Sequence, residues 1–120
     1  VLQIGMDPDV IDFSPWPGQD ADALRARIAK ATDDLQEAGF STTLCLLPND
    51  PEAASSAVSR FLANARYDVV EIGSGLRTSH EFTAIFERVV NEVAALRPGI
   101  RFCFNDSPET TLEAVQRVTR

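Results

Sequence analysis

The chain has 120 residues, of which 44% are hydrophobic, and a formal net charge of −7 at pH 7. This length and composition suit a single α/β domain at residues 1–120 that folds without metals or disulfides. The net negative charge excludes sequence-independent binding to nucleic acid or to anionic membranes, because both need a basic face on the protein. No apolar run approaches the roughly 20 residues of a membrane span. We therefore expect a cytoplasmic protein with no nucleic-acid or membrane partner.

The first strand is expected at residues 1–6, and a polar loop follows it at 7–19. The loop, DPDVIDFSPWPGQ, shows no periodicity and exceeds the roughly 2–6 residues usual for such a connection, which indicates a lid, a binding loop or an interface. The first helix should begin after Asp20 as its N-cap and stop at Gly39, because apolar residues recur between them at helical spacing.

Three more strands alternate with three more helices. Strands are expected at residues 41–47, 68–72 and 100–104. The second helix should follow Asp50 as N-cap with Pro51 at its first position, and the last helix should follow Ser107 in the same way. The third helix is indicated by an apolar stripe at helical spacing: Phe82, Ile85, Phe86, Val89, Val90, Val93 and Leu96.

Strict alternation of strands and helices indicates right-handed βαβ units and a parallel sheet. We expect a three-layer αβα sandwich of flavodoxin-like or Rossmann-like type, with a four-stranded parallel sheet in the order 2-1-3-4. Ligands of such sheets bind outside the carboxyl ends of the strands, where strand order reverses, which is here between strands one and three. The candidate site therefore lies on three loops, at 7–19, 73–78 and 105–108.

The acidic first loop is similar to that of two phosphoryl-transfer classes. Asp7 and Asp9 mimic the D-x-D signature of haloacid-dehalogenase phosphatases, and response-regulator receiver domains also have acidic first loops. Both classes need a lysine after a later strand, yet Lys30 is the only lysine in the chain, and Gly73 stands where a receiver has its phosphoacceptor. Both activities are excluded, no metal is expected, and turns and helix caps explain the acidic residues best.

The segment EIGSGLRTSHE at 71–81 contains two glycines of a dinucleotide-binding fingerprint. Thr78 occupies the position of the third glycine, and the next strand ends in Asn105 instead of a ribose-binding acid, so no nucleotide cofactor is expected. Thr78 and Glu81 instead predict a capping box for the third helix. Arg77 remains as a cation beside that helix N-terminus, where it would hold an anion or neutralise an acidic group across the rim.

Four other residues have side chains that could take part in chemistry. Glu71 lies in an interior apolar strand and is either solvated at the rim, paired with an arginine, or buried with a raised pKa, and we favour pairing. His80 is the only histidine and is interpreted as a surface or capping residue. Cys45 and Cys103 lie inside apolar strands and should be buried free thiols.

Four segments, IGMDPDVIDFS, VVEIGSGLR, EFTAIFERVVNEV and RFCFNDSPETTLEAV, together make the chain resemble a family of small uncharacterised bacterial and fungal cytoplasmic proteins. The resemblance covers almost the whole chain and implies a flavodoxin-like α/β fold, but no established activity. Glu71 and Asp106 depart from the family pattern and lose weight as family-wide catalytic groups. The recurrent residues that the resemblance implies are Asp7, Pro8, Asp12, Phe13, Ser14, Gly73, Gly75, Arg77, Asn105 and Pro108.

These observations predict a site for a small anionic molecule at the carboxyl rim, without identifying catalytic residues or a reaction. Arg77 and the amide groups after Gly75 would hold the anion while the loop at 13–16 closes over it. The alternative is a non-catalytic homo-oligomeric or partner-binding module, with a possible homodimer formed through Trp16, Phe13 and the edge strand at 100–104. The ligand-binding candidates are Asp7, Asp12, Gly73, Gly75, Arg77 and Asn105.

Overall fold

Four parallel strands form the middle layer of the computed structural model, which describes residues 1–120. The strands are β1 (Leu2–Met6), β2 (Thr43–Leu47), β3 (Val69–Ile72) and β4 (Arg101–Phe104), in the order β2-β1-β3-β4. The predicted sheet, its order and the three-layer α/β architecture are confirmed. None of the helices has the length and apolar character needed to cross a bilayer.

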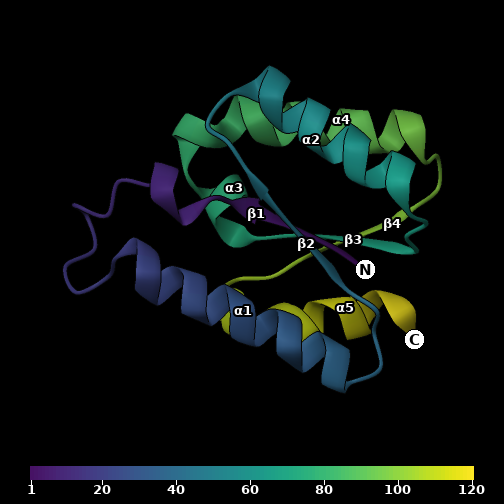
Figure 1. Ribbon diagram of the computed structural model, residues 1–120, viewed down its shortest axis with the longest axis horizontal. Coiled ribbons are helices and arrows are strands. Elements are labelled where there is room, and N and C mark those ends of the chain that lie inside the picture. The colour runs from purple at the N-terminus through teal and green to yellow at the C-terminus, as the bar shows by residue number, and fades with distance from the viewer.

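Helices cover both faces of the sheet (Figure 1). The lower layer in that view holds α1 (Ala21–Glu37) and α5 (Thr111–Thr119), and the upper layer holds α2 (Pro51–Asn64) and α4 (Thr83–Leu96). The predicted N-caps Asp20 and Asp50 are confirmed, because their carboxylates accept hydrogen bonds from the backbone N–H groups of Ala23 and Ala53. Ser107 instead precedes a 3-10 turn, η3 (Pro108–Thr110), and α5 begins only after it. Gly39 follows α1 with φ +95°, a left-handed conformation that favours glycine.

The connection from β3 to the third predicted helix differs from the expectation. A separate short helix, α3 (Ser74–Thr78), follows β3 directly, and a 3-10 turn, η2 (His80–Phe82), precedes α4. Thr78 ends α3, and its hydroxyl donates to the Ser74 carbonyl at 2.8 Å, while η2 and α4 follow Ser79 and Phe82 without any side-chain cap. The predicted capping box of Thr78 and Glu81 is therefore wrong, and there are five α-helices instead of four.

The two faces of the sheet are packed unequally. A cluster of 16 buried residues lies between the sheet and α2 and α4, whereas the cluster between the sheet and α1 and α5 has 5. Side chains alternate along each strand, so Ile4 and Ile72 belong to the large cluster while Gln3 and Glu71 face the small one. Space for a ligand is therefore more readily available on the α1 side.

Candidate functional site

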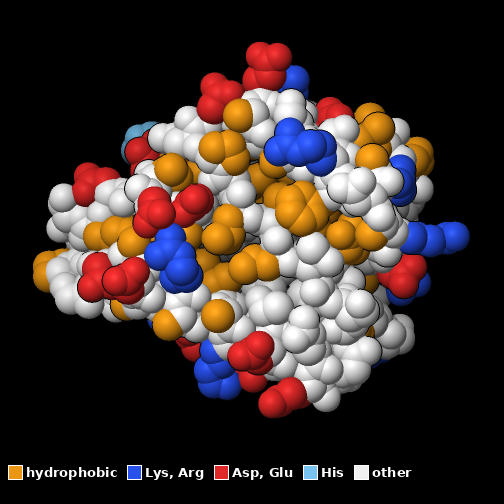
Figure 2. All heavy atoms as spheres, viewed as in Figure 1, with side chains coloured by type: hydrophobic (Ala, Val, Ile, Leu, Met, Phe, Trp, Pro, Cys, Tyr) orange, Lys and Arg blue, Asp and Glu red, His pale blue; other side chains and the backbone are white.

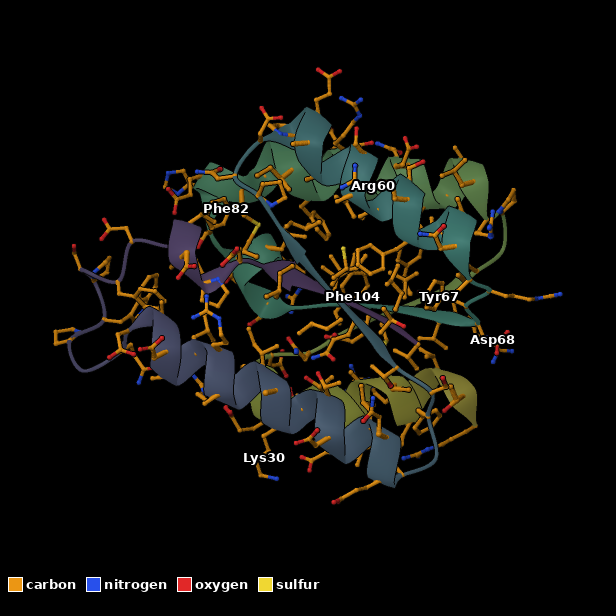
Figure 3. The ribbon with its side chains drawn as sticks, in the orientation of Figure 1. Lys30, Arg60, Tyr67, Asp68, Phe82 and Phe104 are labelled. Carbon is orange, nitrogen blue, oxygen red and sulfur yellow. The ribbon has the colours of Figure 1, made fainter.

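A cavity of about 320 Å³ opens at the carboxyl ends of β1 and β3 and extends between the sheet and α1. Its size falls within the range of roughly 300–1,000 Å³ typical of small-molecule sites. Figure 3 shows Phe82 at the end of the upper layer near the long loop, whereas Tyr67 and Asp68 lie at the opposite end. The hydrophobic lining consists of Ile4, Met6, Ile11, Phe13, Trp16, Leu24, Ile28, Leu44, Leu76 and Phe82.

Topology places the cavity where the sequence predicts it. After β1 the chain passes through a 3-10 turn, η1 (Pro8–Val10), and the long loop to α1 on one face, and after β3 it enters α3 on the way to α4 on the other. Because the two connections leave neighbouring strands toward opposite faces, a crevice remains between them. The 7–19 loop projects beyond the sheet at this end of the molecule (Figure 1).

Gly5 leaves much of this space open. It is in β1, two residues after Gln3 and on the same face, and it lines the cavity. A Cβ atom built on Gly5 would meet no heavy atom within 4 Å, and its φ lies outside the left-handed region that requires glycine. Glycine at this position is therefore not demanded by the backbone, and any side chain there would occupy the cavity.

Glu71 forms part of the cavity wall and is 1% exposed. Its Oε1 atom has no hydrogen-bond partner, and burial raises the pKa of its carboxyl group to about 8. Across the sheet it is in register with Gln3 on β1 and Cys103 on β4. The expected pairing of Glu71 with an arginine is wrong, and the alternative of a buried carboxyl with a raised pKa describes the site.

Two other buried polar side chains around the cavity, Gln3 and Asn105, form hydrogen bonds within the protein. Gln3 Oε1 accepts a hydrogen bond from the hydroxyl of Thr32 on α1 at 2.6 Å. Asn105 Oδ1 accepts from the backbone N–H of Ser74 at 2.8 Å, and its Nδ2 donates to Thr111 Oγ1 at 2.9 Å. Asn105 thus reaches the rim crevice, as expected, and ties β4 to α3 and α5.

Arg77 does not line the cavity. Its guanidinium donates to the backbone carbonyl of Asn105 and lies over the ring of Phe104, 5.7 Å from the centroid. It forms no ion pair with Asp7, Asp9 or Glu71. This arginine therefore fixes α3 against the end of β4, and its charge faces an aromatic ring and a carbonyl.

The acidic residues of the first loop stabilise the loop itself. The Asp7 carboxylate accepts from the Asp9 N–H at 2.9 Å, and Arg25 pairs with Asp7 at 3.5 Å and with Asp9 at 3.0 Å. Asp12 accepts from both the N–H and the hydroxyl of Ser14, which lowers the pKa of its carboxyl group. The interpretation as turns is confirmed, and neither Asp7 nor Asp12 lines the cavity.

The remaining chemically notable residues lie apart from one another. His80 is exposed in η2, and Lys30 points from α1 into solvent (Figure 3). Burial raises the pKa of Cys45 to about 11 and that of Cys103 to about 12, so the buried free thiols are confirmed. No group of three or more His, Cys, Asp or Glu side chains is arranged to hold a metal ion.

The sequence-derived site and the cavity overlap in part. Gly73, Gly75 and Asn105 line it, whereas Asp7, Asp12 and Arg77 do not. Gln3 and Gly5 were not predicted as site residues, although a glutamine in a buried strand gives the same signal as Glu71 does.

The chain matches no protein-family model, no curated protein and no solved structure. The family resemblance expected from the sequence therefore stays a prediction. Function has to be argued from the cavity, whose 25 lining residues include ten hydrophobic ones and one buried carboxyl group with an unpartnered oxygen.

Proposed function

We propose that the protein binds a small organic molecule with a mainly apolar body in the cavity between β1, β3 and α1. The observation that carries this proposal is the space above Gly5, which no neighbouring side chain fills and which hydrophobic side chains surround. Protein interiors are close-packed, so a space of this size at the switch point of a parallel sheet favours a ligand site.

The long loop supplies a lid for this site. Phe13 and Trp16 both contribute to the cavity lining, and Trp16 is nevertheless 50% exposed. A large hydrophobic side chain that is half in water at a cavity mouth gains burial when a ligand meets it, at about 25 cal/mol for each Å² of apolar surface covered. The loop at 7–19 would then close over the bound molecule.

The anionic character expected for the ligand finds little support in the charges of the wall. Arg27 is the one cationic residue of the lining, and it already forms a bidentate pair with Glu109, with Nε to Oε2 at 2.8 Å. An anionic ligand would have to displace Glu109 from Arg27, or draw Arg77 away from Asn105. The anionic ligand stays a prediction, and the apolar body is the better supported feature.

A fragment screen on the unmodified protein and on Gly5→Val tests this proposal. Valine at residue 5 fills the cavity without a clash at Cβ and suits a strand, so the fold should persist while fragments that bind the cavity lose at least about tenfold in affinity. Binding is measured by NMR titration of the backbone amides. Ala84→Leu, which adds the same number of carbon atoms at an exposed site on α4, is the matched control and should bind fragments normally.

Two outcomes of this screen would contradict small-molecule binding in the cavity. If no fragment shifts amide signals of cavity residues, or if every fragment binds Gly5→Val as well as the unmodified protein, the cavity is not the site. Circular dichroism of Gly5→Val confirms that the comparison is made on folded protein.

We propose as a second candidate function self-association or partner binding through the edges of the sheet. Both β2 and β4 are edge strands, with one side of each free of strand pairing. Figure 2 shows hydrophobic side chains in a band between the two helical layers, on the face where β2 runs in Figure 1. Exposed edges and apolar bands of this kind favour pairing. A strict monomer in light scattering at millimolar concentration would remove the homodimer.

A further inference from the structure

We propose that the ligand of the cavity is a primary amine with an apolar, aromatic-sized body, and that the carboxyl group of Glu71 receives its ammonium group. This inference rests on the proposed function, since it names the chemical class of the molecule that the same cavity binds. It reverses the sign of the charge expected from Arg77.

Glu71 is placed to receive a hydrogen-bond donor from a ligand. Its side chain is 1% exposed, lies on the cavity wall and leaves Oε1 without a hydrogen-bond partner. A buried oxygen without a partner costs about 1–3 kcal/mol, and such groups are rare in folded proteins. A ligand that donates hydrogen bonds to this oxygen would remove the cost.

The side-chain oxygens near Glu71 are already engaged in hydrogen bonds within the protein. The oxygen of Gln3 is held by Thr32, and both ends of the Asn105 amide are bound within the protein. Thr111 donates its hydroxyl to the Pro108 carbonyl and Thr78 donates to Ser74. The Gln3 amide nitrogen has no such bond, so Glu71 Oε1 is the buried side-chain acceptor of the cavity that remains for a ligand.

An ammonium group fits this carboxyl better than a neutral or anionic group does. Once both are charged, the pair forms charge-assisted hydrogen bonds about twice as strong as neutral ones. In an apolar cavity each charge needs its partner, because an isolated buried charge is costly. An anionic ligand beside Glu71 would meet a second carboxyl group and no free cation.

The charge of the surroundings favours the approach of a cation. The protein carries a net charge of −7, and Asp9 and Asp12 lie exposed on the loop at the cavity mouth. Figure 2 shows acidic side chains around a basic one at the end of the molecule where Figure 1 places this loop, and Arg25 pairs with Asp7 and Asp9. A negative potential of this kind raises the local concentration of cations and the rate of their association.

The charged groups around Glu71 are few enough to make its titration simple. The titratable neighbour on β4 is Cys103. The charged lining residue on α1 is Arg27, which is paired with Glu109. On α5, Arg117 donates to the Phe104 carbonyl. Asp106 is the remaining charged lining residue, and β1 offers the uncharged Gln3 opposite Glu71. Desolvation by burial is the cause of the raised pKa of Glu71, and no neighbouring charge contributes to that shift.

The amine should therefore bind with release of a proton. Below its pKa of about 8 the free Glu71 is protonated, and it must ionise to pair with an ammonium group. The apparent affinity should rise about tenfold for each pH unit between pH 6 and 8, and level off above the pKa of Glu71.

The test uses 2-phenylethylamine as the probe, with 2-phenylethanol and phenylacetate as neutral and anionic molecules of similar shape. Each is titrated into the full chain at pH 6.5 and 8, by NMR for the site and by calorimetry in two buffers for the protons released. The variants are Glu71→Gln, Gly5→Val and the control Glu81→Gln, an exposed glutamate outside the cavity.

The expected result is amine binding at least about tenfold tighter than alcohol binding at pH 8, with close to one proton released at pH 6.5. Glu71→Gln should lose that preference and its pH dependence, while Glu81→Gln keeps both and Gly5→Val loses binding of every probe. Equal binding of amine and alcohol, or an unchanged amine affinity in Glu71→Gln, overturns the inference but leaves small-molecule binding standing if Gly5→Val abolishes it. Absence of amine binding at millimolar concentration also overturns the inference, and the wider fragment screen then decides the proposed function.

Discussion

Glu71 is the one acidic side chain that the sheet buries, and its protonation should couple to folding. An unfolded glutamate ionises near pH 4.5, whereas the folded protein holds the pKa of this carboxyl at about 8. The folded state therefore binds the proton more tightly. Its contribution to stability is fully present below pH 4.5 and is lost as pH rises through 8.

We expect the free energy of unfolding of the unmodified protein to fall, relative to Glu71→Gln, by roughly 3–5 kcal/mol between pH 5 and pH 9. Glutamine keeps the shape but does not titrate, so the variant isolates this group from the other carboxylates. Urea denaturation at unit pH steps measures the difference. If the two proteins kept parallel profiles, Glu71 would be ionised or paired in the native state.

Arg77 illustrates how a residue with the attributes of a ligand-binding group serves the structure instead. Its hydrogen bond to the Asn105 carbonyl and its stacking on Phe104 are contacts within the protein. Arg77→Ala should cost about 1 kcal/mol of stability and leave the affinity for cavity ligands unchanged. Arg88→Ala, at an exposed site of α4, is the control in the same denaturation experiment. A variant of normal stability that lost binding of an anion would restore the role expected from the sequence.

The 7–19 loop is the element whose motion the proposed function requires. Its side chains Phe13 and Trp16 line the cavity, and Trp16 is the only tryptophan of the chain. Closure over a ligand should move its indole from water to an apolar setting, so the fluorescence emission should shift to shorter wavelength in step with binding. Titration of the unmodified protein and of Gly5→Val under excitation of tryptophan measures this. Saturating ligand without any change in emission would show that the loop does not close.

The elements that the sequence predicted well are those whose signals are local. Apolar periodicity and the caps at Asp20 and Asp50 set the strands and the long helices, and alternation then dictated the sheet and its rim. The connection after β3 was misjudged because Thr78 can either cap a following helix or end a preceding one. In the structure α3 starts directly after Gly73, so Thr78 falls at the end of that helix.

At the scale of the whole molecule, the cavity arises from the unequal packing of two helical layers. The sequence located the rim, since alternation predicts a parallel sheet for which 2-1-3-4 is the simplest order, but it did not show which polar side chains reach the rim. Whether Glu71 pairs with an arginine depends on which other groups bind Arg25, Arg27 and Arg77. The partner of Arg27, Glu109, is 82 residues away in the chain. Such long-range competition is absent from any local pattern.

Amine binding beside Glu71 is tested most directly by a crystal structure of the protein grown with 2-phenylethylamine, above pH 8 where Glu71 ionises. We predict electron density for the ring in the space above Gly5, with the ammonium nitrogen within hydrogen-bond distance of the Glu71 carboxyl group. A cavity closed by its own side chains, with Glu71 bonded to another residue of the protein and no density beside it, would show that the cavity does not bind the amine.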